Sequence, residues 1–177
     1  MDREFYEVTE NYLTSTFHFF ESDHRTFDIV YDDITSFSSK IKITTTSSID
    51  LDKLKSFYRY ADGFLIDSSY VESLASLDCY NISLIPVEIT DNFISIDTFY
   101  YMKVHSVINC VNFNKSQYHQ EGDVISFQSI SIVNDKIGLK DRVFFIDDEY
   151  SILMDNEVLS IFNQDNEVIV NSVNNIT

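Results

Sequence analysis

Two side chains in the middle of the chain, His105 and Cys110, are of the types that form a Cys–His nucleophile. They lie in the stretch FYYMKVHSVINCVNFNKSQY, residues 99–118. A catalytic thiol needs a histidine beside it in space and a basic, partly exposed setting. On one strand, two residues five positions apart point to opposite faces, and the apolar residues Ile108 and Val111 surround Cys110. We therefore interpret Cys110 as a small residue of the apolar core.

Metal-dependent chemistry would need clustered ligands. The histidines are His18, His24, His105 and His119. No two of them are four residues apart, the spacing that places two ligands on one helix face. The acidic stretch 155–167 lacks the alternating acids and the glycine of an EF-hand loop. Three other acidic groups could ligate a divalent metal in a nuclease: residues 31–34, 50–52 and 146–150.

Basic residues are missing where such a nuclease would need them. From Val143 onward the sequence has no Lys, Arg or His to hold a nucleic acid. The chain also has only three glycines, which are far apart, so it has no glycine-rich phosphate-binding loop. We therefore expect no enzyme, no metal and no cofactor. A metal-dependent enzyme that uses Asp147, Asp148 and Glu149 remains the weaker alternative.

The charge balance is strongly acidic. There are 29 acidic and 12 basic residues, giving a net charge of −17 at pH 7. Such a chain repels nucleic acid and anionic membranes, and it attracts basic partners. The alternative is that the acidic residues serve only to keep the protein soluble. The first residues, MDREFYEVTENYL, lack a basic stretch followed by an apolar one, so we expect no secretory signal. No apolar run reaches the length of about 20 residues that spans a bilayer. We therefore expect a cytoplasmic protein that binds neither nucleic acid nor membrane.

The elements that position these residues read as an α+β fold, mostly antiparallel β-sheet with two or three short helices. The patterns predict strands over 15–22, 27–34, 40–46 and 82–89, and β-structure over 97–111 and 122–148. A helix is predicted over 48–61, capped by Ser48 or Asp50. Pro86 should mark a strand edge, a strand start or a bulge. Asn134 and Gly138 should form turns.

One arrangement occurs twice. FLID (64–67) and ILMD (152–155) are short apolar strands that end in an aspartate. After each, the pattern predicts a short helix capped by that aspartate, followed by another strand. This suggests one strand–helix–strand module used twice within a single domain of 177 residues. In that domain, residues 1–59 form a β-rich N-terminal part and 60–177 contain both copies.

Three segments give a family resemblance: LIPVEI (84–89), YYMKVHSVINCVNFNKSQY (100–118) and RVFFIDDEYSILMDNEV (142–158). Their order over about residues 60–177 resembles the immunity-protein-eleven family of bacterial polymorphic-toxin systems. The matching positions are Pro86, Val87, Tyr100, Tyr101, Val104, Asn109, Cys110, Lys115 and Ser116. Asn109 stands where the family commonly has Asp, and the resemblance does not extend to residues 1–59.

The resemblance implies a small cytoplasmic protein without cofactor. It would bind and neutralise the toxin of its own or sibling cells in interbacterial competition, and the matching residues would be packing residues of the fold. Many such toxins cleave nucleic acid through a basic cleft, which carboxylates can occupy in place of phosphates. A second hypothesis remains open, a phage-type acidic mimic of nucleic acid that blocks a DNA-binding protein.

Charge density gives the candidate toxin contacts, and the family resemblance does not select them. The acids are densest from residue 147 onward, and two aromatic neighbours could anchor a partner. The predicted contact residues are Phe145, Asp147, Asp148, Glu149, Tyr150, Asp155 and Glu157.

Overall fold

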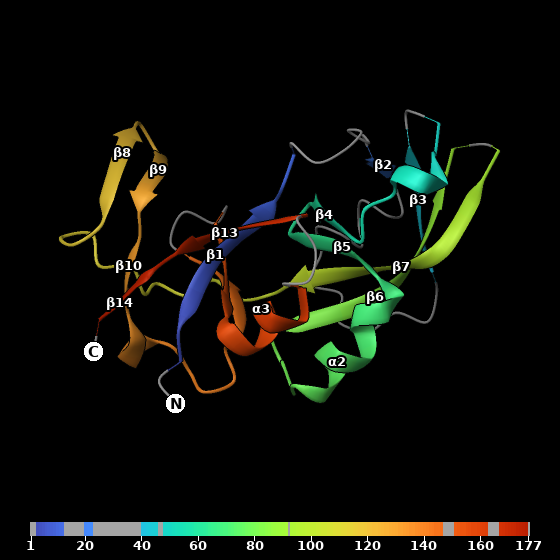
Figure 1. The fold of residues 1–177 in the computed structure, drawn as a ribbon. Helices are drawn as coiled ribbons and strands as arrows, with labels where there is room; N and C mark the ends of the chain where they lie inside the picture. The colour runs from blue at the N-terminus through green and yellow to red at the C-terminus, as the bar shows by residue number, and fades with distance from the viewer. Residues whose placement is uncertain are drawn as a thin grey trace.

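The computed structural model describes residues 3–12, 20–22, 40–45, 48–91, 93–146, 151–162 and 167–176. These residues form mostly antiparallel β-sheets with few helices (Figure 1). The strands are β1 (Phe5–Glu10), β2 (Phe20–Ser22), β3 (Ile41–Thr45), β4 (Phe57–Tyr60), β5 (Gly63–Asp67), β6 (Ile82–Thr90), β7 (Ser95–Val104), β8 (Gln117–Glu121), β9 (Val124–Ser129), β10 (Ser131–Val133), β11 (Val143–Phe145), β12 (Ile152–Asp155), β13 (Val168–Ser172) and β14 (Asn174–Ile176). The helices are α2 (Val71–Ser76) and α3 (Asn156–Phe162), with short 3-10 turns at Leu51–Lys53, Ser68–Tyr70 and Asn134–Lys136.

The larger sheet has six strands in the order β2-β3-β6-β7-β5-β4. Its centre is the antiparallel pair β6 and β7, and β3 joins β6 in parallel. The pairing with β3 begins only at Val87, so Pro86 lies where β7 is the one described partner of β6. Proline has no N–H to donate to a second neighbour. The ladder is also irregular between Val87 and Ile89, which confirms the expectation of an edge or bulge near Pro86.

The smaller sheet has the order β11-β12-β1-β13. Here β1, from the start of the chain, runs antiparallel between two strands from its end, β12 and β13. This pairing builds the N-terminal residues into the C-terminal half of the fold.

Two strand–helix–strand units have the same arrangement around a central strand. In the first unit, β5 and β6 lie on either side of β7, and α2 connects them along the chain. In the second, β12 and β13 lie on either side of β1, and α3 lies between them in the sequence. The predicted cap at Asp155 is confirmed, because Asp155 accepts the Val158 N–H of α3 at 2.9 Å. Asp67 accepts the Ser69 N–H at 2.9 Å and caps the 3-10 turn Ser68–Tyr70, whereas α2 itself begins after Tyr70 without a side-chain cap.

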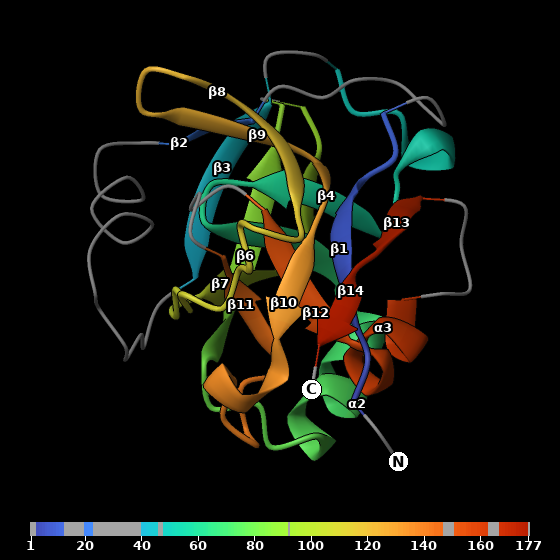
Figure 2. The same ribbon diagram turned by 90° about the vertical axis from the view of Figure 1, so that its left-hand side faces the viewer.

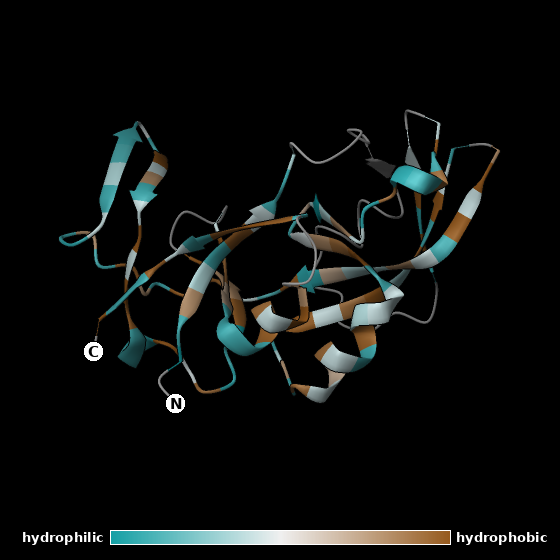
Figure 3. Ribbon diagram, in the orientation of Figure 1, coloured by the Kyte–Doolittle hydropathy of each residue, from teal (hydrophilic) through white to brown (hydrophobic). Residues whose placement is uncertain are grey.

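The main core lies where the two helices meet the sheets. The Phe162 ring of α3 packs edge-on against Tyr70 and Phe57, with centroids 5.1 and 5.2 Å apart. Figure 1 shows α2 and α3 side by side on this face. On β5, Phe64 points into this core and Leu65 into a second cluster on the opposite face. The six-stranded sheet is therefore buried on both faces at β5, and Figure 3 shows hydrophobic colouring along this strand.

The helix predicted over 48–61 is wrong. Only Leu51–Lys53 form a 3-10 turn, which Asp50 caps by accepting the Asp52 N–H at 3.2 Å. Beyond it, β4 pairs with β5. Phe57 is buried in the main core, beside the helices, and its neighbour Tyr58 is buried in the second cluster, on the opposite face of the sheet. Adjacent side chains on opposite faces are the geometry of a strand, and pairing with β5 overrides the helical spacing.

Several other predicted elements are confirmed where the structure describes them, although the β-structure predicted over 97–111 is a strand only as far as Val104. The strand predicted over 40–46 is β3, whose buried Ile41 and Ile43 alternate with the exposed Lys42. Asn134 begins a 3-10 turn, and the Gly138 carbonyl accepts the Asp141 N–H at 3.0 Å. Within 15–22 only β2 is described, and the strand predicted over 27–34 lies outside the described residues. Across the described ranges, no helix is long and apolar enough to span a bilayer.

Candidate functional site

The thiols occupy sites that suppress their reactivity. Cys110 is fully buried in an apolar cluster with Phe5 and Phe144, as the sequence predicted. Cys79 is half-buried, and its burial raises the pKa of the thiol to about 11. A thiol with such a pKa is protonated at neutral pH and is a poor nucleophile.

His105 and Cys110 do not share one strand, so the predicted reason for keeping them apart does not apply. Strand β7 ends at Val104, before either residue. His105 Nε2 instead lies 2.7 Å from the Ser83 hydroxyl of β6. Within the parts of the chain that the structure describes, no group of three or more His, Cys, Asp or Glu is placed to hold a metal ion.

The predicted toxin contacts fall into three groups. Asp147, Asp148, Glu149 and Tyr150 lie outside the described residues. Phe145 is 6% exposed, with the guanidinium of Arg59 at 5.7 Å from its ring. Asp155 is fully buried. Only Glu157 presents an exposed side chain among the described members. Burial of Phe145 and Asp155 in the folded chain therefore removes both from the candidate contact surface.

Asp155 has a structural role instead. Its Oδ1 caps α3, and its Oδ2 lies 2.9 Å from Arg142 Nη1 and 3.4 Å from Arg3 Nη2. Arg142 also pairs with Glu157 at 2.8 Å. The high density of acids near the C-terminus is thus partly neutralised by Arg142, which lies just before this region, and by Arg3, which is distant in the sequence. That pairing is a tertiary feature, which a local count of charges does not reveal.

A hairpin that the contact prediction missed stands out from the body of the fold. It is formed by β8 and β9, which project beside the smaller sheet (Figures 1 and 2). All five residues of β8 are exposed, and β9 alternates between exposed and intermediate residues. The two-residue turn contains Gly122, whose positive φ of 62° suits a glycine. The Gly122-Asp123 pair, followed by the alternating residues of β9, is the sequence signal that identifies this hairpin.

Three aromatic rings cluster at the base of the hairpin. The Tyr118 ring centroid is 5.3 Å from that of Phe113 and 6.0 Å from that of Phe127. Phe127 also packs against the cluster around Cys110. Phe113 and Tyr118 are 36% and 41% exposed. The cluster therefore joins a rigid core to an accessible aromatic surface, the kind of feature that anchors protein partners.

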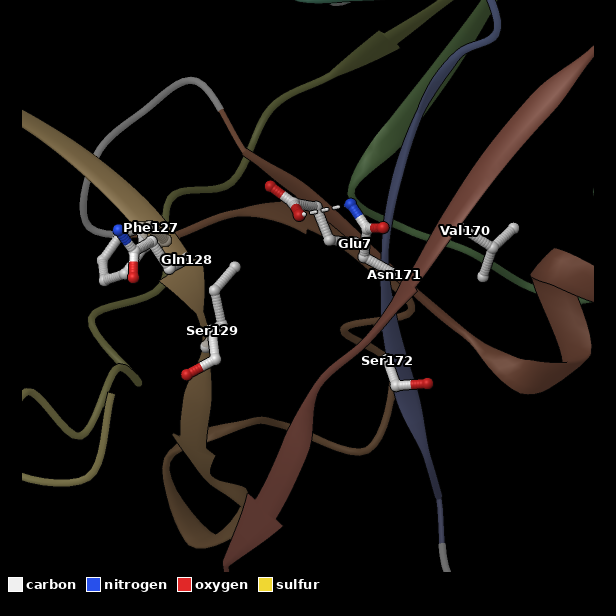
Figure 4. Close-up of a pocket in the computed structure, with 8 residues that line it drawn as sticks. Glu7, Phe127, Gln128, Ser129, Val170, Asn171 and Ser172 are labelled. Atoms are coloured by element: carbon white, nitrogen blue, oxygen red, sulfur yellow. Dashed lines mark hydrogen bonds between the residues drawn. The ribbon is translucent and has the colours of Figure 1, made fainter. Parts of the chain in front are cut away.

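A groove separates this hairpin from the smaller sheet. Its volume is about 380 Å³. One wall comes from the β9 side and the other from β13, with Glu7 of β1 between them (Figure 4). The lining residues are Glu7, Phe127, Gln128, Ser129, Ile130, Val170, Asn171 and Ser172. Glu7 is the one charged member of this lining, and its Oε2 accepts a hydrogen bond from Asn171 Nδ2 at 3.0 Å.

The groove is closed at one end by strand pairing. Directly after β9 and β13, the strands β10 and β14 pair in parallel. The Asn174 N–H donates to the Ile130 carbonyl at 2.9 Å and marks the junction. The two chain segments thus form a fork, paired at β10 and β14 and open between β9 and β13. We call this space the fork groove.

No family model matches the sequence, and no curated protein matches it. The fork groove and the adjoining aromatic cluster therefore form the candidate site on geometry alone.

Proposed function

We propose that this protein is an immunity protein, which binds a cognate bacterial toxin by direct contact and neutralises it. The observation that carries the proposal is the aromatic surface of the β8–β9 hairpin, with Phe113 and Tyr118 exposed beside an open groove. Exposed, rigidly held aromatic residues favour binding over catalysis. The resemblance over about residues 60–177 supplies the toxin as the kind of partner.

The chemistry of the described residues supports a binding protein rather than an enzyme. Both thiols are buried or half-buried, and burial raises the pKa of Cys79. The charge of −17 favours a basic partner and would speed its association. A toxin that cleaves nucleic acid through a basic cleft fits this charge, so occlusion of such a cleft in the bacterial cytoplasm is the mode of neutralisation we propose.

The repeated architecture fits the same proposal. We infer that β5–α2–β6 and β12–α3–β13 are one strand–helix–strand module used twice, because both units flank a central antiparallel strand and an aspartate at the end of the first strand caps the helical segment that follows, a 3-10 turn before α2 and α3 itself. The modules would form a scaffold, with the hairpin added between them in the sequence.

The test is co-expression with a candidate toxin. Where a neighbouring gene encodes a large secreted protein, its C-terminal domain is the toxin to use. We expect the full chain to restore growth and to copurify with that domain as a stoichiometric complex. A folded chain that neither protects cells nor binds the domain would contradict the proposal. Capture of a host DNA-binding protein instead would favour the nucleic-acid mimic.

Point variants locate the surface. Tyr118→Ala should weaken binding of the toxin domain at least tenfold, because it removes an exposed ring from the aromatic cluster. Leu139→Ala is the control, since Leu139 is 89% exposed and lies outside the cluster and the fork groove. Equal losses in both variants, or no loss in either, would place the contact surface elsewhere.

A further inference from the structure

We propose that the fork groove receives an extended, cationic segment of the partner protein, which pairs as an additional β-strand between β9 and β13. This inference rests on the proposed function for the identity of the partner. The backbone of the two strands and the charge of the groove support this mode of binding.

The edge of β13 that faces the groove carries backbone groups without a strand partner in the described part of the chain. The Asn11 N–H donates to the Glu167 carbonyl at 2.7 Å, and the register then pairs Glu7 with Asn171. In antiparallel pairs the hydrogen-bonding direction alternates along the strand. The backbone groups of Asn171 therefore turn toward β1, and those of Val170 and Ser172 turn toward the groove.

The fork continues that same phase. Asn174, two residues after Ser172, directs its N–H to Ile130 on the opposite arm. The backbone groups of Val170 and Ser172 therefore point in the same direction as the Asn174 N–H, toward the chain segment that contains β9. A strand inserted between β9 and β13 would lie in their path. On the opposite side of the groove, β8 is the one described strand that pairs with β9. The other edge of β9 therefore has no strand partner in the described residues and is available on the groove side.

Two other sheet edges in the described residues are covered. Along β4, the Arg59 N–H donates to Glu10 Oε2 at 2.9 Å, and the preceding Ser56 N–H donates to Glu167 Oε2 at 2.6 Å. Along β11, the Phe145 N–H donates to Ser106 O at 2.9 Å. Proteins cover exposed edges because an open strand is a template for pairing with another chain. The open edge of β13 therefore differs from the covered edge on the other side of its own sheet.

The sequences of the two groove strands lack the usual protection against edge pairing. Charged residues, especially Lys, and Pro normally block an open edge. β9 (VISFQS) and β13 (VIVNS) contain no charged residue and no proline, although 23% of the chain is charged. Both strands are thus compatible with strand addition, in which main-chain hydrogen bonds supply affinity and side-chain sites supply specificity.

Charge selects a cationic partner over a second copy of this chain. The one charged side chain lining the groove is Glu7, and the hairpin tip adds the exposed acids Glu121 and Asp123. Two copies of a chain with a net charge of −17 would repel each other at this site. A strand with a Lys or Arg side chain directed at Glu7 would instead be attracted, and the carboxylate would favour one register of the incoming chain.

The test compares two substitutions at one residue, using the full chain and the candidate toxin domain. Val170→Pro removes the N–H that faces the groove, whereas Val170→Ala shortens the side chain and keeps that N–H. We expect the proline variant to bind at least tenfold more weakly than the alanine variant. Glu7→Gln should lower affinity severalfold, and the loss should shrink at high salt. Equal binding by the proline and alanine variants would overturn strand addition and leave the proposed function intact.

Exchange and mass measurements complete the test. If Val170→Pro does not fold, hydrogen–deuterium exchange of the wild-type protein decides the same question. Bound toxin should slow exchange at Val170 and Ser172, and unchanged exchange there would overturn the proposal. If the wild-type protein binds no toxin, the proposed function and the toxin as occupant both fail. Light scattering of the isolated protein tests the alternative occupant. If the wild-type protein is a dimer and Val170→Pro dissociates it, the strand that enters the groove belongs to a second copy of this chain and the proposed toxin strand is wrong.

Discussion

Replacement of Asp155 should destabilise the fold by considerably more than the loss of a helix cap. Asp155 is fully buried, accepts the Val158 N–H, and pairs with Arg142 and Arg3. Asp155→Asn keeps an oxygen for the cap but removes the charge. Breaking a buried ion pair costs about 3–5 kcal/mol. Because the side chains of Arg142 and Arg3 remain 21% and 25% exposed and can recover water, we expect about 3 kcal/mol.

Two further substitutions separate the cap from the ion pair. Asp155→Ala loses both contributions and should cost about 1 kcal/mol more than Asp155→Asn. Glu157→Gln removes the other partner of Arg142, but Glu157 is 57% exposed. It should therefore cost less than about 1 kcal/mol. At Asp67, whose carboxylate accepts the Ser69 N–H as a cap, alanine should cost about 1 kcal/mol.

The assay is urea unfolding followed by circular dichroism, because the chain contains no tryptophan. With a urea dependence of about 2 kcal/mol per molar, Asp155→Asn should lower the midpoint by about 1.5 M. A midpoint within about 0.5 M of the wild type, with an unchanged slope, would refute the reasoning. It would mean that attraction within the buried pair only balances the cost of desolvating it.

Three other predictions concern separate parts of the fold. Cys110→Ser should cost about 1–3 kcal/mol in thermal or urea unfolding, because a hydroxyl replaces a thiol in an apolar site; lost toxin neutralisation with an unchanged melting curve would show that Cys110 is more than a core residue. Gly63→Ala should lower the melting temperature strongly, since a Cβ there would overlap the backbone oxygen of Met102; wild-type melting would contradict this packing. Asp91 accepts backbone N–H groups of Ile49, Ile94 and Phe93, which lower its pKa, so the stability advantage over Asp91→Asn should be complete above about pH 4 and should disappear as the pH falls through the folded-state pKa. A difference in melting temperature that stays constant down to acid pH would argue against a charged Asp91 as the acceptor.

Local sequence was sufficient for elements whose pattern agrees with their environment. The alternation of Ile41, Lys42 and Ile43 predicted β3 because one face of that strand is buried and the other is exposed. Asp67 and Asp155 were predictable caps because a short carboxylate satisfies the free N–H groups of the first helical turn, which is a local interaction. The burial of Cys110 followed in the same way from its apolar neighbours.

Tertiary structure decided the features that depend on residues far apart in the sequence. Phe57 and Tyr58 fit a helix by spacing, but pairing of β4 with β5 placed them on opposite faces of a strand. The sequence predicted an exposed Asp155 in contact with a partner, but the fold buries it against Arg3 and Arg142. The fork groove could not be predicted either. A strand edge is free only when no other strand pairs with it, and that depends on the tertiary arrangement of all the strands. Composition determined the net charge of the protein, whereas long-range pairing determined which charges and which backbone groups remain available to a partner.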